Sequence, residues 1–219
     1  MDYLSFWSQK MYEHMLFINF LTLDDFIKQE SKRLMDAWLE VVYEVDASPD
    51  LKETDDIERL LQETRQFKLA LLQDPTKSNR ILPPSKVADL LDHMLLELDY
   101  FLGLLNGTLT PQEELKILAF ENADHDNFLL HSFKNPDPEV TETLQGVIDQ
   151  LMKEAKSEYG PDGELKYWLK TSNKTTKEVD DLIKNGYLES IIPDALREHE
   201  LSEGKWEVER YNYLISEKF

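Results

Sequence analysis

The chain has 219 residues, with 44 aspartates and glutamates against 24 lysines and arginines, which gives a formal net charge of −20. This acidity argues against nucleic-acid and anionic-membrane partners, because both bind proteins through lysine and arginine. The chain has no cysteine. Disulfides, thiolate metal sites and cysteine nucleophiles are therefore excluded, and any metal must be held by histidine and carboxylate side chains.

The N-terminal sequence has an acid, Asp2, where a signal peptide needs basic residues. The apolar runs all fall short of the ~18 residues that a transmembrane helix needs. Only 7 glycines occur, and the valines and isoleucines do not form alternating runs, so helices are favoured over strands. These features predict a soluble cytoplasmic protein, and they leave a homodimer and a small-molecule substrate open.

Apolar residues recur at helical spacing along most of the chain, which predicts an all-α fold. The stripe over residues 7–21 predicts a first helix that includes His14. A capping box at Thr22-Leu23-Asp24-Asp25 is predicted to open a second helix through roughly Val45. A third helix is predicted between loops at 46–54 and 74–79, and Pro83-Pro84 opens a fourth that ends near Gly107. The inward-facing residues of the second and third helices are predicted to be Phe26, Leu34, Trp38, Val41, Ile57, Leu60, Leu61, Thr64, Phe67 and Leu71.

The second half repeats this order of elements. Thr110-Pro111-Gln112-Glu113 predicts a capping box and a helix to about Phe133, and Asp137 begins another helix that ends near Gly160. A weaker helical stretch follows around 168–184, and Pro193 opens the last helix. The chain is therefore predicted to be a single compact helical domain, 1–219, with an internal repeat of 1–108 and 110–219.

Four of the five histidines fall at equivalent positions in the two halves. Glu13-His14-Met15-Leu16-Phe17-Ile18 matches Asp124-His125-Asp126-Asn127-Phe128-Leu129, and Asp92-His93 with Glu97 matches Glu198-His199 with Glu203. A histidine and a glutamate four residues apart lie on one helix face and can bind the same ion. Each half therefore offers two imidazoles and one carboxylate as candidate metal ligands: His14, His93 and Glu97 in the first half, and His125, His199 and Glu203 in the second.

Two imidazoles and one carboxylate suit iron, manganese or zinc, and we expect iron or manganese before zinc. If the halves pack about a pseudo-twofold axis, the two triads meet in the bundle core as a dinuclear centre or as one crowded site. Acids beside the histidines are expected either to accept a hydrogen bond from the ring nitrogen that does not bind metal or to face solvent. These weaker candidates are Glu13, Asp92, Asp124 and Glu198, together with Glu121, which lies four residues before His125; Glu30 is a further inward candidate, and His131 is predicted to be a surface residue near a helix end.

A family resemblance rests on the same motifs. Phe6-Trp7, then Glu13-His14 with Phe17-Ile18, and then Asp92-His93-Met94 with Glu97 on a proline-opened helix, followed by a second copy, resemble the bacterial proteins called domain of unknown function 2935. The resemblance spans nearly the whole chain and implies a two-repeat, ferritin-like helical bundle, similar to metal-binding members of that fold. The second copy departs from the pattern, with Ile117-Leu118 in place of Phe-Trp and with Gly204 directly after Glu203.

Two functions follow from these observations. The first is a metal-binding, ferritin-like protein, with an oxidoreductase or an oxygen- or peroxide-handling activity as its enzymatic form. The second is a metal-free helical protein whose histidines are hydrogen-bonded in the core and whose acidic surface binds a basic partner or keeps it soluble. The metal content of the purified protein distinguishes the two.

Overall fold

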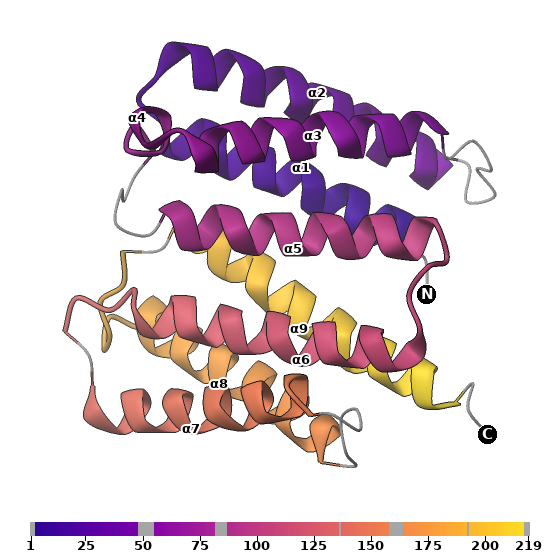
Figure 1. The fold of residues 1–219 in the computed structure, drawn as a ribbon. Coiled ribbons are helices and arrows are strands. Elements are labelled where there is room, and N and C mark those ends of the chain that lie inside the picture. The colour runs from indigo at the N-terminus through magenta and orange to yellow at the C-terminus, as the bar shows by residue number, and fades with distance from the viewer. Residues whose placement is uncertain are drawn as a thin grey trace. The chain divides into compact units, whose positions relative to one another are not determined.

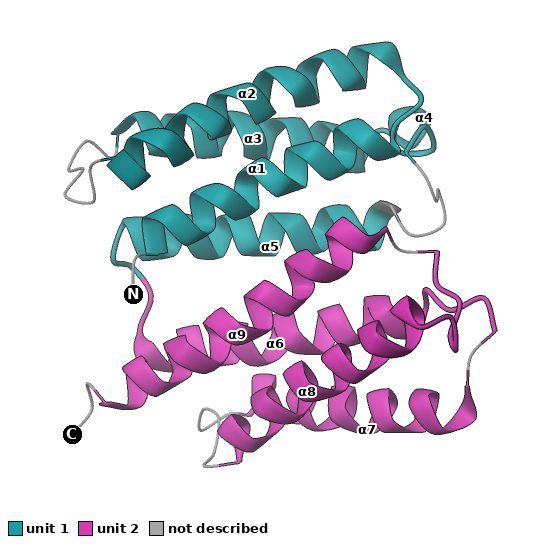
Figure 2. Ribbon diagram, turned by 180° about the vertical axis from the view of Figure 1, so that it is seen from behind, with its two compact units in different colours: residues 1–108 teal, residues 109–219 magenta. Residues whose placement is uncertain are grey.

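The computed structural model describes residues 3–47, 55–81, 87–135, 137–157, 164–191 and 193–216. Within these ranges the regular structure consists of nine helices, with no strand (Figure 1). The predicted all-α helical bundle is thereby confirmed. The chain divides into two compact units, residues 1–108 and residues 109–219 (Figure 2).

Unit 1 is a bundle of four long helices. α1 packs against α2 and α5, and α3 packs against the same two helices, so that the four enclose one core (Figure 1). The centre of this core is aromatic: the ring of Phe101 lies 6.4 Å from those of Trp7 and Trp38, centroid to centroid. The helices of unit 1 are α1 (Tyr3–Leu21), α2 (Asp25–Ala47), α3 (Asp55–Gln73), the short α4 (Pro75–Ser78) and α5 (Val87–Leu105).

Unit 2 has the same cyclic arrangement of four helices. α6 packs against α7 and α9, and α8 packs against all three of the others. The capping box predicted for α6 is confirmed: the Thr110 side chain accepts from the Glu113 amide, and the Glu113 side chain accepts from the Thr110 amide. Asp137, predicted to begin the next helix, caps α7 by accepting from the amides of Glu139 and Val140. The helices of unit 2 are α6 (Pro111–Leu130), α7 (Pro138–Ala155), α8 (Leu165–Lys184) and α9 (Asp194–Ser216).

Buried positions recur between the units. Leu4, Trp7, Met11, His14 and Ile18 are buried in α1, and the residues 111 positions later in α6 are buried as well. An isolated antiparallel bridge joins Thr22 to Ile81 in unit 1, and a second joins Phe133 to Ser190 in unit 2. Each bridge connects the end of a unit's first helix to the segment before its last helix. In each unit it therefore helps to fix the axial register of the two helices that carry the candidate ligands.

The start of α2 differs from the prediction. Asp24, not Thr22, caps the helix, since its carboxylate accepts from the amides of Phe26 and Ile27 at 3.0 and 3.1 Å. This start places Ile27 in the core and leaves Phe26 67% exposed, so the predicted inward position of Phe26 is wrong. Adjacent helical residues are about 100° apart, so both cannot face the core.

Other predicted boundaries also shift. The predicted loop at 74–79 contains α4, which Asp74 caps by accepting from the Thr76 amide. α7 ends at Ala155, earlier than the predicted end, and the residues 158–163 around that predicted end lie outside the described residues, as do Pro83 and Pro84. None of the described helices has an apolar stretch of the length and hydropathy that crossing a membrane requires.

Candidate metal centre

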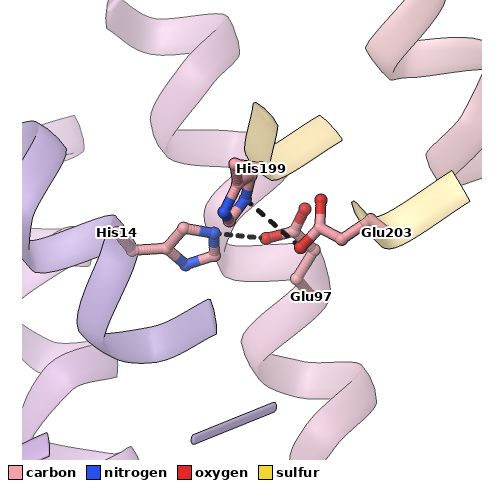
Figure 3. A group of neighbouring side chains, drawn as sticks. All are labelled: His14, Glu97, His199 and Glu203. Atoms are coloured by element: carbon pink, nitrogen blue, oxygen red, sulfur yellow. Dashed lines mark ion pairs between the residues drawn. The ribbon is translucent and has the colours of Figure 1, made fainter. Parts of the chain in front are cut away.

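In unit 1, α1 and α5 bring His14, His93 and Glu97 together. Nε2 of His14 lies 2.6 Å from Oε2 of Glu97, and Nε2 of His93 lies 2.6 Å from Oε1 of the same carboxylate. His14 and Glu97 are buried and His93 is half-buried. Figure 3 shows the contact between His14 and Glu97. The carboxylate therefore lies between two imidazoles and offers one oxygen to each.

Local sequence explains how these side chains reach the core. His14 belongs to the apolar stripe of α1, with Met11 and Ile18 buried on the same face. His93 and Glu97 lie one turn apart on α5, and each directly precedes a buried apolar residue, Met94 and Leu98 respectively. A buried carboxylate is costly unless it is paired or coordinates a cation.

A buried lysine on α3 contacts the other ring nitrogen of His14. Nζ of Lys68 lies 3.0 Å from Nδ1 of His14 and donates to the backbone oxygen of Met94 at 2.8 Å. An ammonium group has donors and no acceptor, so Nδ1 of His14 accepts and the ring proton resides on Nε2. Lys68 is thus hydrogen-bonded to one ring nitrogen of His14, and Glu97 lies against the other.

Unit 2 repeats the arrangement of ligands. Nε2 of His125 lies 3.1 Å from Oε2 of Glu203, and Nε2 of His199 lies 3.2 Å from Oε1. The pair of His199 and Glu203 is drawn in Figure 3. All three residues are buried. As in unit 1, the histidine on the unit's first helix and the histidine one turn before the glutamate contact different oxygens of one carboxylate.

Among the described residues, unit 2 buries more acidic side chains than unit 1. Asp126, next to His125, is fully buried and accepts from Thr176 of α8 at 2.9 Å. Burial raises the pKa of Asp126 from 3.8 to about 6, although hydrogen bonds from Ser172 and Thr176 work to lower it. The residue at the matching position of α1 is Met15. Buried acids also occur at 114, 121, 200 and 207 in this unit.

Gly204 lies on α9 directly after Glu203. A Cβ atom at this position would lie 3.4 Å from the side chain of Asn173 on α8. This is an ordinary van der Waals distance, so a methyl group here would contact Asn173 without forcing α8 and α9 apart.

The structure resembles a solved protein from Bacillus cereus G9241, which is described as uncharacterized. The TM-score is 0.71 at 14% sequence identity, over 96% of this chain and 89% of that chain. No protein-family model matches the chain, and neither does any curated protein. At this identity the likeness shows the fold alone, so the chemistry must be argued from the side chains.

The weaker candidates lie in different surroundings. Glu13 is half-buried and binds Lys10, whose Nζ is 2.8 Å from its Oε2. Asp92 and Glu198 are exposed, and Asp124 is half-buried. The exposure of Asp92 and Glu198 agrees with the expectation that acids beside the histidines face solvent.

The remaining residues considered in the sequence analysis are Glu121, Glu30 and His131. Glu121 is buried in α6, one turn before His125. Glu30 lies at the surface of α2, where it binds Arg33 at 2.7 Å, which argues against the inward position considered for it. His131 is exposed and directly follows α6, in agreement with its predicted place at a helix end.

Sequence analysis missed Lys68. The buried residues of α3 are Ile57, Leu61, Thr64, Lys68 and Leu71, so the lysine continues the inward stripe without a break. The sequence therefore indicated a buried lysine, because Lys68 is a charged residue at a position where the helical spacing of this segment places core residues. Asp126 carried no comparable signal, because it stands among other polar residues in α6.

Proposed function

We propose that the chain is a metal-binding protein that uses its two histidine–glutamate triads to hold divalent transition-metal ions. The observation that carries this proposal is the repeated geometry: in each unit one buried carboxylate offers its two oxygens to two different imidazoles. The ligands proposed are His14, His93 and Glu97 in unit 1, and His125, His199 and Glu203 in unit 2.

The spacing of the donor atoms supports coordination. Ligands about 2.1 Å from one ion lie about 3 Å from each other when they are cis. The nitrogen–oxygen separations of 2.6 Å in unit 1 and of 3.1 and 3.2 Å in unit 2 are close to this value. Each triad supplies three ligands, so further side chains or water must complete the coordination. The predicted meeting of the two triads in one centre stays a prediction.

The donor set favours iron or manganese, with zinc as the third choice. Bound iron or manganese would supply electron-transfer chemistry, so an oxidoreductase or an oxygen- or peroxide-handling role is the enzymatic form of the proposal. The resemblance to domain of unknown function 2935, with its ferritin-like fold, agrees with this choice. The recurring buried positions of α1 and α6 support the internal duplication that the resemblance implies.

A metal-free function is the alternative. Two imidazoles that donate to one carboxylate form a charge-assisted hydrogen-bond network, which can satisfy a buried glutamate without any ion. In unit 1 the contact between Lys68 and His14 favours this network, since it places a positive charge on the side of the His14 ring opposite Glu97.

Metal analysis of protein purified without a histidine tag tests the proposal. After growth in medium supplemented with iron, manganese and zinc, we expect one or two metal equivalents per chain. Glu97→Gln and Glu203→Gln keep side-chain volume and remove a ligand charge, so each should lose metal while circular dichroism stays helical. His131→Gln and Asp92→Asn, which change exposed residues, should retain full metal. Wild-type protein without metal would establish the metal-free alternative instead.

A further inference from the structure

Lys68 is a buried cation that the proposed metal site does not use. It is fully buried on α3, with its Nζ between Nδ1 of His14 and the backbone oxygen of Met94, at 3.0 and 2.8 Å. Burying an ammonium is costly unless partners satisfy it. A lysine retained here, in contact with a proposed ligand, therefore bears on how that ligand binds.

In the contact between Lys68 and His14, the histidine accepts the hydrogen bond, whereas a metal-bound histidine usually donates one. A metal-bound histidine coordinates through one ring nitrogen and donates the proton of the other to a carboxylate, a carbonyl or water. His14 faces Glu97 with Nε2, so coordination there puts the ring proton on Nδ1. Nδ1 then points an N–H at the ammonium of Lys68, which has no acceptor. Binding an ion at His14 thus breaks a hydrogen bond and brings two positive charges close together.

Unit 2 lacks this cation at the matching position. The buried residues of α8 follow those of α3 in one register, with Leu165, Leu169, Ser172 and Val179 at the positions of Ile57, Leu61, Thr64 and Leu71. The residue in the place of Lys68 is Thr176. It is neutral, and it donates to Asp126 at 2.9 Å. The unfavourable contact between a lysine and a metal-bound histidine is therefore expected for His14 in unit 1 and not at the matching position of unit 2.

We propose that Lys68 is a positioning residue that weakens metal binding at His14, so that the ion held by His14 is the most weakly bound in the chain. This inference rests on the proposed function, because it concerns the affinity of the same ligands. When the supply of metal falls, the site that contains His14 is therefore expected to lose its ion first.

The test is a zinc titration of the full chain in competition with a chromophoric chelator. Lys68→Gln replaces the ammonium with an amide, whose oxygen can accept from Nδ1 of His14 and whose N–H can donate to Met94. We expect the weakest zinc-binding step to tighten by about 10- to 100-fold, the range typical of partners that orient metal-bound histidines. Lys68→Met removes the charge without the acceptor and should give a smaller gain.

The control is Lys10→Gln. Lys10 is another buried lysine of unit 1, but it is paired with Glu13 at 2.8 Å. This variant should leave the zinc affinities unchanged. An equal gain in zinc affinity in Lys10→Gln, or no gain in either Lys68 variant, would overturn the inference about Lys68. The proposed function would still stand in that case, provided that the wild type binds zinc. Wild-type protein that binds no zinc would overturn both.

A second measurement does not depend on any variant. Long-range proton–nitrogen correlation spectra of the metal-free wild type report which ring nitrogen of His14 carries the proton. We expect the proton on Nε2 in the metal-free protein and on Nδ1 after zinc is added. A metal-free His14 protonated on Nδ1 would contradict the role of Lys68, even if the lysine variants do not fold.

Discussion

Asp180→Asn should strongly destabilise unit 2. Asp180 lies on α8 and is buried, where it accepts from Nε of Arg197 at 2.9 Å and from Nζ of Lys184 at 2.8 Å. Arg197 lies on α9, two residues before His199, so this pair joins the two helices beside the candidate ligands. The substitution keeps the shape of the side chain and removes its charge.

The magnitude follows from the exposure of the partners. The side chains of Arg197 and Asp180 are 3% and 4% exposed, so removing the charge takes a close counter-ion from a buried guanidinium, which keeps its ion pair with Asp194. Breaking a buried pair costs about 3–5 kcal/mol, and we expect the lower end because Asp194 and the amide oxygen remain. Lys184 is 44% exposed, so its share is below about 1 kcal/mol.

Urea unfolding followed by circular dichroism measures this loss. The matched control is Asp181→Asn, the next residue, whose carboxylate is 55% exposed and binds Lys177 at 2.9 Å; it should change the free energy of unfolding by less than about 0.5 kcal/mol. A loss in Asp180→Asn no larger than in this control would refute the reasoning.

The same pair predicts a pH dependence. Burial works to raise the pKa of Asp180, but the hydrogen bonds from Lys184 and Arg197 outweigh it and hold the pKa below its usual value of 3.8. The folded protein therefore binds fewer protons here than the unfolded chain does, and the stabilisation present above pH 3.8 is lost as the pH falls through the lowered pKa. The difference in stability between wild type and Asp180→Asn should accordingly shrink in acid, and a difference that stays constant would contradict this assignment.

Three further outcomes are expected. Thr64→Val should lower the free energy of unfolding by about 1–3 kcal/mol in urea titrations, because it leaves the indole N–H of Trp38 without the acceptor that lies 2.9 Å away; Thr64→Ser should cost less. Phe26→Ser should change the same quantity by less than about 0.5 kcal/mol, because Phe26 is 67% exposed, whereas a large loss would restore its predicted place in the core. Chelation should lower the melting temperature, since an ion at a hundredfold excess over its dissociation constant adds about 2.7 kcal/mol; Glu97→Gln should show a smaller drop, and unchanged melting of the wild type would contradict the site.

The sequence by itself determined the helices and the faces they bury. Apolar spacing, caps such as Thr110 with Glu113, and helix-opening prolines act within a few residues of the chain, so they can be read without a structure. The same periodicity placed His14 on a buried face, and the four-residue spacing placed His93 and His199 one turn before their glutamates. Local rules were ambiguous at Thr22 and Asp24, where two capping residues compete, and there the prediction for Phe26 was wrong.

Only the tertiary structure decided which helix faces meet. Periodicity shows that Lys68 lies on an inward stripe, but its contact with His14, 54 residues away, depends on how α3 packs beside α1 and α5. The assignment of one imidazole to each oxygen of Glu97 and of Glu203 also depends on that packing. A buried charge is tolerated only with a partner, and in a helical bundle that partner comes from another helix, far away in the sequence. The identity of the partner is therefore a property of the packed bundle, which the pattern of a single helix does not contain.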